Sequence, residues 1–199
     1  MPAVIATMSI SLDGIGARPD QTEQKPMGDI PGHVLHRWMF DTPDENRAEM
    51  AALTSAGAYI MGRNMFGPIR GEWTGDWNGW WGPEPPYHRA VFVLTHHPRP
   101  SLEMDGGTTF HFVTEGIRTA LDRAREAAGD RPVHVAGGVS TINAYLAADL
   151  IDELHLQIAP VVLGHGLRLF DGVGQLDLVQ ESVRAASLVT HVRYRVTRG

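Results

Sequence analysis

Short apolar runs, each ended by glycine or polar residues, recur along the chain and predict buried β-strands. They lie at residues 3–10, 58–61, 91–95, 110–113 and 133–136. Two later segments, 153–158 and 189–196, alternate apolar and polar side chains, which is the pattern of strands with one buried face. The chain is therefore expected to build a sheet from strands spread over its whole length.

Amphipathic segments between these runs predict helices. The clearest are residues 116–128 and 141–148, whose apolar side chains recur at helical spacing. A short helix is expected within residues 32–40, and another through residues 44–56 with Asp44 as its cap. Strands interleaved with helices and then joined by short links indicate an α/β fold, with a mixed, mostly parallel sheet and antiparallel C-terminal strands.

Residues 70–88 form the one long segment without periodicity, and they hold four of the five tryptophans. A loop of this length inside a compact domain is usually functional or mobile. The four indoles, Trp73, Trp77, Trp80 and Trp81, either form a lid that excludes water from a reaction or pack on the loop's own surface or a subunit interface. The sequence favours neither alternative.

Length and composition bound the class of protein. A chain of 199 residues with 43% hydrophobic content suits one domain over residues 1–199. A formal charge of -6 disfavours nucleic acid and anionic membranes as partners. The absence of cysteine excludes disulfides, a thiolate nucleophile and the cysteine-ligated zinc of base deaminases. With no basic leader or long apolar segment, the protein is expected to be cytoplasmic.

Two glycine turns stand where a predicted strand runs into a predicted helix. One is Gly62-Arg63-Asn64, and the other is Gly137-Gly138-Val139-Ser140-Thr141. Unpaired N–H groups and the positive end of a helix favour an anion at such places, so two turns could hold the two phosphates of a dinucleotide. Glycine turns also arise for conformational reasons, and spacing alone leaves the two explanations even. A Rossmann domain is disfavoured because no G-x-G-x-x-G follows the first strand.

Other candidate residues are ambiguous on sequence alone. Thr95-His96-His97 could meet an adenosine 2′-phosphate or form an ordinary polar turn. Asp13 could orient a substrate or assist proton transfer, or serve an Asp-Gly turn. Trp38, with its neighbours, could wall an apolar pocket. No metal site is expected, because the His33 and His36 pair lacks a third ligand in sequence. A serine hydrolase is disfavoured because G-x-S-x-G is absent.

Several motifs occur in an order that resembles the reductase (C-terminal) domain of bifunctional riboflavin-biosynthesis proteins, within the dihydrofolate reductase-like superfamily. They are SLDG at 11–14, YIMGRNMFG at 59–67, VFVLTHHPRP at 91–100, VHVAGGVSTINAYL at 133–146 and LIDELHLQIAPVVLGHGLRLF at 150–170. The resemblance runs essentially end to end, and the Gly-Gly turn with the later DEL and PVVLGHG is its most specific part. It implies a stand-alone member with a three-layer α/β/α fold, a small-molecule substrate and a homodimer.

The resemblance also implies roles for individual residues. NADPH would be the cofactor, bound by Gly62, Arg63, Asn64, Thr95, His96, His97, Gly137, Gly138, Val139, Ser140 and Thr141. Asp13 would be the catalytic residue at the nicotinamide and substrate cleft, and Trp38 and Phe66 would contact the substrate.

One departure from the family pattern bears on the substrate. The first motif usually continues SLDG-K-I-A, whereas this chain has Ile15 where the lysine stands. The leading expectation is a reductase resembling 5-amino-6-(5-phosphoribosylamino)uracil reductase, with hydride passing from NADPH to a heterocyclic or ribosylamine substrate. The alternatives are a dihydrofolate or pterin reductase, and a non-catalytic nucleotide- or flavin-binding relative.

Overall fold

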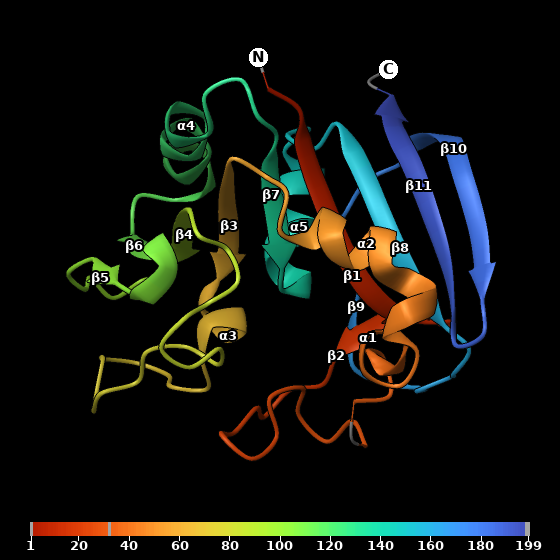
Figure 1. Ribbon diagram of the computed structural model, residues 1–199, viewed down its shortest axis with the longest axis horizontal. Coiled ribbons are helices and arrows are strands. Elements are labelled where there is room, and N and C mark those ends of the chain that lie inside the picture. Colours follow the sequence, from red (N-terminus) through yellow and green to blue (C-terminus); the bar gives the residue numbers. More distant parts are fainter. Residues whose placement is uncertain (1, 32, 198–199) are drawn as a thin grey trace.

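The computed structural model describes residues 2–31 and 33–197, and its centre is a nine-stranded sheet (Figure 1). The strands of this sheet are β1 (Val4–Ser11), β3 (Ala58–Gly62), β4 (Ala90–Leu94), β5 (Leu102–Glu103), β6 (Thr109–Val113), β7 (Val133–Gly137), β8 (Glu153–Ala159), β10 (Asp177–Ala186) and β11 (Val189–Thr197). Their order is β10-β11-β8-β1-β7-β3-β4-β6-β5. Two short strands, β2 (Ile15–Ala17) and β9 (Leu167–Arg168), form a separate antiparallel pair.

The six strands β8-β1-β7-β3-β4-β6 run parallel to one another. The antiparallel pairs are β11 with β8, β10 with β11, and β5 with β6. The predicted fold class, a mostly parallel mixed sheet with antiparallel C-terminal strands, is therefore confirmed. Because parallel strands share their direction, the carboxyl ends of β1, β3, β4 and β7 meet at one edge.

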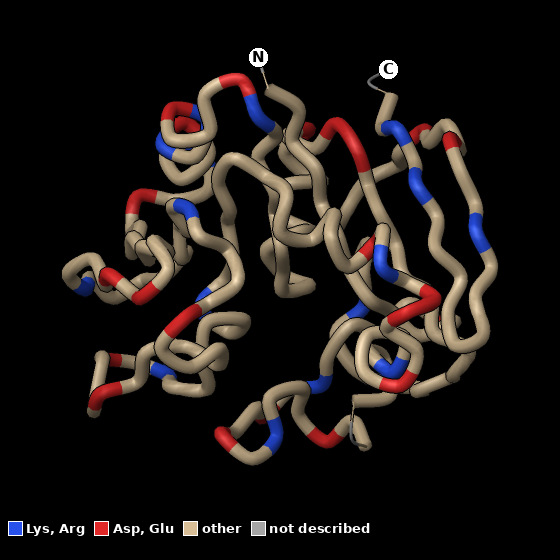
Figure 2. The backbone as a smooth tube through the Cα atoms, viewed as in Figure 1, with Lys and Arg blue, Asp and Glu red and all other residues tan. Residues whose placement is uncertain are grey.

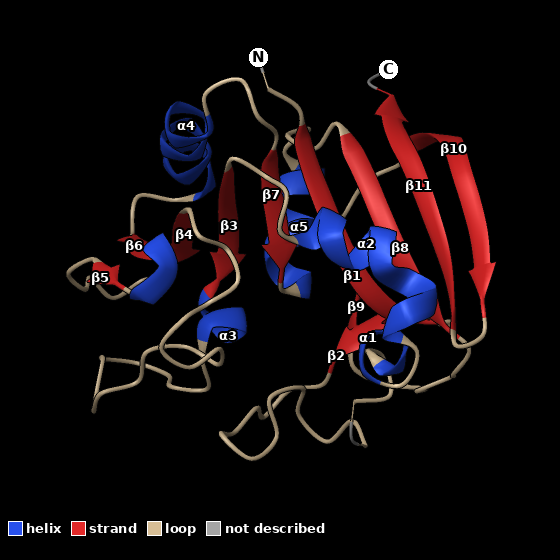
Figure 3. Ribbon diagram, viewed as in Figure 1, coloured by secondary structure: helices blue, strands red, loops and turns tan. Residues whose placement is uncertain are grey.

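Helices cover both faces of the sheet, which gives the three layers expected (Figure 3). On one face lie α4 (Ile117–Ala128) and α5 (Val139–Ala147), whose buried side chains share a core cluster with alternate residues of β1 and β7. On the other face α1 (Arg37–Phe40), the 3-10 helix η1 (Pro43–Asn46) and α2 (Arg47–Leu53) lie over β1 and β8. A single-turn helix α3 (Arg63–Phe66) follows β3, and a 3-10 turn η2 (Asp105–Gly107) precedes β6.

Strand β3 shows why its sequence is a continuous apolar run. Ala58 and Ile60 join the cluster under α4 and α5, whereas Tyr59 and Met61 join a second cluster on the opposite face. All four are fully buried, and each large apolar side chain so buried stabilises the fold by about 1.5–3 kcal/mol. This double burial fixes where β3 ends, and so fixes the position of the turn at Gly62.

The helix predicted through residues 44–56 is shorter than expected, and its predicted cap is wrong. Residues before Arg47 form η1, and α2 ends at Leu53. Thr42, not Asp44, occupies the N-cap position of η1, and Asp44 instead pairs with the exposed Arg47 side chain at 2.6 Å. Proline at the first position of η1 supports the tighter turn. Of the helix predicted within 32–40, α1 is the helical part, and residue 32 lies outside the described residues.

Basic and acidic positions are interspersed over the fold rather than gathered on one side (Figure 2). No helix within residues 2–31 and 33–197 is both long and apolar enough to cross a membrane.

Candidate functional site

The two glycine turns lie side by side at the carboxyl edge of the sheet. Strands β3 and β7 are neighbours, and Met61 pairs with Gly137 in their register. A Cβ atom on Gly62 would lie 2.3 Å from the Thr141 hydroxyl oxygen and 3.7 Å from the Gly138 nitrogen. A methyl group at position 62 would therefore collide with the Thr141 hydroxyl in its present position, so glycine allows the two turns to lie this close.

The second turn exposes backbone to an incoming group. Gly137 has a φ of +133°, a conformation that favours glycine, and the Gly137–Gly138 peptide is cis. A Cβ on Gly138 would meet no atom within 4 Å, so the space beside this backbone is open. Among the described side chains none caps the start of α5 at Val139, so its first N–H groups remain available to an anion.

Arg63 brings a guanidinium to the same place. It stacks on the Trp73 ring at 3.8 Å from the centroid, and its Nη1 lies 3.5 Å from the Thr95 hydroxyl oxygen. Nε and Nη2 are buried and have no hydrogen-bond partner within the described part of the chain. Burial, assisted by the nearby Arg70 and Arg99, lowers the pKa of Arg63. Buried donors of a charged group are costly when unsatisfied, so this guanidinium is suited to an anionic ligand.

The tryptophan-rich segment, residues 70–88, packs on the outer face of β3, β4 and β6. Trp73 Nε1 donates to the His97 carbonyl at 2.8 Å, and Trp77 Nε1 donates to the Phe66 carbonyl at 3.0 Å. Arg99 Nη1 donates to the Trp77 carbonyl at 2.7 Å. These contacts pack the loop on its own domain, and whether it also serves as a lid stays a prediction. The contact of Trp73 with Arg63 could not be read from the pattern, because the two residues belong to separate predicted elements.

The three residues that follow β4 differ in how closely they approach Arg63. Thr95 is buried beside Arg63, and its hydroxyl oxygen also accepts from the His97 N–H at 3.1 Å. His97 Nδ1 lies 3.1 Å from a Glu72 carboxylate oxygen, whereas His96 and Asn64 are exposed. The structure thus brings Thr95 to Arg63 of the first turn and places His97 beside Thr95.

On the second turn, Val139 is buried and Ser140 is exposed. A pocket of about 350 Å³ borders them, lined also by Asn143 of α5 and by Arg168 of β9.

Asp13 lies at the end of β1 but its carboxylate is occupied. Oδ1 accepts from the Ser11 hydroxyl at 2.6 Å and from the Leu163 N–H at 3.0 Å, and Oδ2 accepts from the Gly164 N–H at 2.8 Å. The Ser11 hydrogen bond, followed by that from Leu163, holds the pKa of Asp13 well below its usual range. In this geometry the ionised carboxylate fixes the loop after β8, and a catalytic role for Asp13 stays a prediction.

Trp38 and Phe66 are both packing residues in the structure. Trp38 is 1% exposed, and its Nε1 donates to the Ser9 hydroxyl at 3.3 Å beneath α1. Phe66 is fully buried, with the rings of Trp73, Phe110 and Phe112 edge-on at 5.1–5.9 Å between centroids. Neither ring presents an open face, and their contact with substrate also stays a prediction.

This sheet order, with its helical layers and its paired glycine turns, defines an α/β domain of the dihydrofolate reductase-like type. The chain belongs to the RibD C-terminal domain family, whose model matches residues 2–192. One curated relative, the uncharacterized protein YwjB of Bacillus subtilis (strain 168), is 37% identical over 86 residues. That match covers 43% of this chain and spans about half of the relative, 47% of its length.

Solved structures share the fold at low sequence identity. A Shewanella sp. PV-4 protein assigned to riboflavin biosynthesis has a TM-score of 0.64 at 21% identity, covering 98% of this chain and 99% of that one. Acinetobacter baumannii RibD (form 1) has a TM-score of 0.64 at 19% identity, covering 100% and 59%. The riboflavin biosynthesis reductase Rib7 of Saccharomyces cerevisiae has a TM-score of 0.57 at 15% identity, covering 99% and 89%. The fold is thus shared with reductases of riboflavin biosynthesis.

Proposed function

We propose that this chain is an NADPH-dependent reductase that transfers hydride to a heterocyclic or ribosylamine substrate. Membership of the RibD C-terminal domain family supports an oxidoreductase. A structural neighbour from Thermotoga maritima, with a TM-score of 0.57 at 15% identity, is described as a 5-amino-6-(5-phosphoribosylamino)uracil reductase joined to a deaminase. A compound of that class is the first substrate to test.

The observation that carries the proposal is the Arg63 guanidinium, whose buried Nε and Nη2 lack partners within the described residues, beside the two adjoining turns. The residues fit a phosphorylated dinucleotide, since open backbone at Gly138, uncapped N–H groups at the start of α5 and this guanidinium all favour anionic oxygens. When bound, NADPH would supply the hydride. The chain's own part is to hold the phosphates, with Thr95 beside Arg63.

Binding is tested first. Thermal unfolding measured with and without saturating NADPH or NADH should show a higher midpoint with NADPH, because a ligand that binds only the folded state stabilises it. No shift with either nucleotide would overturn the proposal. Turnover is then followed as loss of NADPH absorbance with the aminouracil ribosyl phosphate and, separately, with dihydrofolate.

A pterin reductase would need an apolar pocket for a flat ring, and Trp38 is the candidate wall. Trp38 is buried and offers no open face to such a ring, which weakens the support for this alternative. A non-catalytic nucleotide-binding relative is motivated by Ile15 at the position of the family's lysine. Binding of NADPH with no oxidation across both substrates would favour that relative over a reductase.

A further inference from the structure

Trp73, in the tryptophan-rich segment 70–88, lies against the Arg63 side chain beside the first glycine turn. The guanidinium carbon of Arg63 is 3.8 Å from the centre of the Trp73 ring, which is a close cation–π contact. A guanidinium donates hydrogen bonds only within its own plane. A ring that restrains this plane therefore also restrains the direction in which Arg63 can donate.

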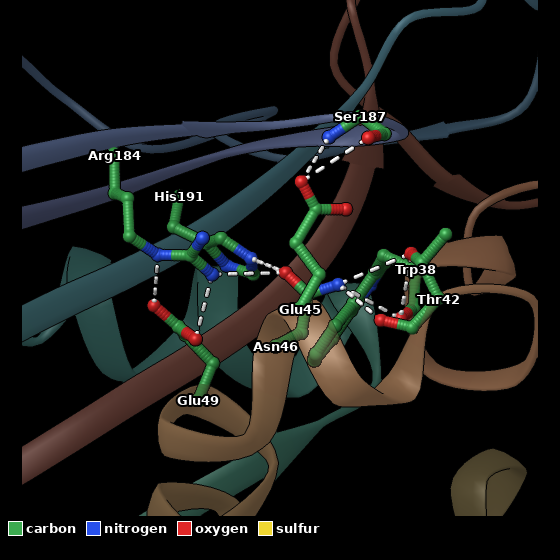
Figure 4. A network of polar contacts seen from close by, with 8 residues as sticks. All are labelled: Trp38, Thr42, Glu45, Asn46, Glu49, Arg184, Ser187 and His191. Carbon is green, nitrogen blue, oxygen red and sulfur yellow. Dashed lines mark hydrogen bonds and ion pairs between the residues drawn. The ribbon is translucent and has the colours of Figure 1, made fainter.

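Arg184 shows how the same fold holds an arginine by ion pairing. Its Nε and Nη2 donate to the two carboxylate oxygens of Glu49 at 2.7 and 2.8 Å, and Nη2 also donates to Asn46 Oδ1 at 2.9 Å (Figure 4). The same two nitrogens of Arg63 have no hydrogen-bond partner among the described residues. None of the ion pairs in that part of the chain involves Arg63. Packing, rather than ion pairing, thus holds Arg63.

The other contact that restrains the Arg63 guanidinium is weak. Nη1 lies 3.5 Å from the Thr95 hydroxyl oxygen, at the outer limit of a hydrogen bond, and that oxygen already accepts from the His97 N–H at 3.1 Å. Nη1 carries two N–H groups, so it keeps donor capacity for a closer acceptor. The side chain as a whole is half-buried. The contact with Trp73 is therefore the one that sets how the guanidinium lies.

Trp73 is itself held from several sides. Its Nε1 donates to the His97 carbonyl at 2.8 Å, and the guanidinium carbon of Arg99 lies 5.1 Å from its ring centre. The rings of Phe66 and Phe112 meet it edge-on, with ring centres 5.9 and 5.0 Å away. An indole fixed by these contacts is a rigid support for the cation beside it.

The other indoles of the segment pack on aromatic rings. Trp77 and Trp80 meet edge-on with ring centres 4.6 Å apart, and Trp81 stacks on Phe110 at 5.9 Å. Of the four indoles, Trp73 alone has a guanidinium over its ring in the described part of the chain. Trp80 is thus a control of the same residue type in the same loop.

We propose that Trp73 is a positioning residue, which acts through Arg63 by holding its guanidinium ready for an anionic group of the nucleotide. This inference rests on the proposed function, because the anion is a phosphate of NADPH. Without the indole, the long Arg63 side chain gains freedom that it has to lose again on binding. Removing Trp73 should therefore raise KM for NADPH and leave kcat unchanged.

A double-mutant cycle separates positioning from a general effect on the loop. Affinity for NADPH is measured by calorimetry for wild type, Trp73→Leu, Arg63→Met and the double variant. Trp73→Leu should weaken NADPH about 3- to 10-fold, the effect of immobilising one long side chain. In the Arg63→Met background the same change should alter affinity by less than about twofold, because the residue through which Trp73 acts is gone.

Two further variants complete the cycle. Trp73→Phe keeps an aromatic face and should bind NADPH more tightly than Trp73→Leu does. Trp80→Leu should bind NADPH as wild type does, and thermal unfolding shows that each variant folds. If Trp73→Leu weakens NADPH equally with and without Arg63, or if Trp80→Leu weakens it as much, the loop gives only general support and the proposal is wrong.

Proton and nitrogen NMR of the ligand-free protein gives a readout that does not depend on the nucleotide. The Arg63 Nε–H resonance of wild type should be shifted upfield by the indole ring and should exchange slowly with water. Trp73→Leu should abolish both properties, whereas Trp80→Leu should preserve them. An Arg63 resonance without the upfield shift in wild type, or unchanged in Trp73→Leu, would overturn the proposal. Failure of wild type to bind NADPH would instead reject the proposed function, and the ligand-free spectra would then decide the role of Trp73 alone.

Discussion

Replacing Arg63 by Met tests whether the guanidinium is held in place for an anion. Methionine keeps an apolar contact with Trp73 while removing the buried Nε and Nη2 that lack partners in the described structure. An unsatisfied buried polar group costs about 1–3 kcal/mol. The stacking on Trp73 contributes about 0.5–2 kcal/mol in the opposite direction. The difference between the two effects leaves the ligand-free variant between about 1 kcal/mol less stable and about 2.5 kcal/mol more stable than wild type.

Ligand-free stability is measured by thermal unfolding. About 2 kcal/mol corresponds to a rise in Tm of about 4–8 °C for a chain of this length. The exposed Arg118 of α4 supplies the control, because Arg118→Met should alter stability by no more than about 0.5 kcal/mol. Affinity is measured by calorimetry with NADPH and NADH. Loss of charge-assisted hydrogen bonds, worth about 1.5–3 kcal/mol, should weaken NADPH by about 10- to 100-fold.

Comparing NADPH with NADH shows which phosphate of the nucleotide Arg63 binds. If Arg63 faces the 2′-phosphate, Arg63→Met weakens NADPH alone; if it faces the pyrophosphate, NADPH and NADH weaken equally. A variant that is clearly less stable than Arg118→Met, and that binds both nucleotides as well as wild type, would refute the reasoning. In that case the guanidinium would serve only to support Trp73.

Three further predictions concern other parts of the molecule. Asp13→Asn should lower Tm and speed protease cleavage within residues 160–166, because an amide cannot accept from all three donors that its carboxylate engages; unchanged cleavage would contradict this role. Burial lowers the pKa of His134 to about 4 from its usual 6.5, so the unfolded chain binds more protons between those pH values. The free energy of unfolding therefore falls as pH drops from 6.5 to 4, by up to about 3 kcal/mol. The free energy of unfolding, measured with urea at each pH, should depend less on pH in His134→Gln than in wild type. We also propose a homodimer that covers β10, whose Val179 and Val183 are 42% and 51% exposed; light scattering should give the mass of two chains for wild type and of one for Val183→Lys.

Sequence reasoning located the strands that are buried on both faces, because such strands are short apolar runs with glycine or polar ends. β3 and β7 are examples, and each runs one residue beyond its predicted range, to Gly62 and Gly137. β10 was not predicted. Residues 177–186 are mostly exposed and mix charged, polar and apolar side chains, so no alternation marks them as a strand. Their pairing with β11 along nearly the whole strand supplies the order that the local pattern lacks.

The candidate site was predictable in its parts but not in its assembly. The glycines at 62 and 137–138 can be read from the sequence, whereas their contact depends on β7 inserting between β1 and β3, a long-range pairing that no local pattern encodes. Trp73 covers Arg63 through a loop without periodicity. Trp38 lies on α1 with its indole N–H donating to the Ser9 hydroxyl, a packing contact that the sequence pattern does not encode, and its contact with substrate stays a prediction. An aromatic residue in a sequence pattern does not reveal which of its two faces will be covered.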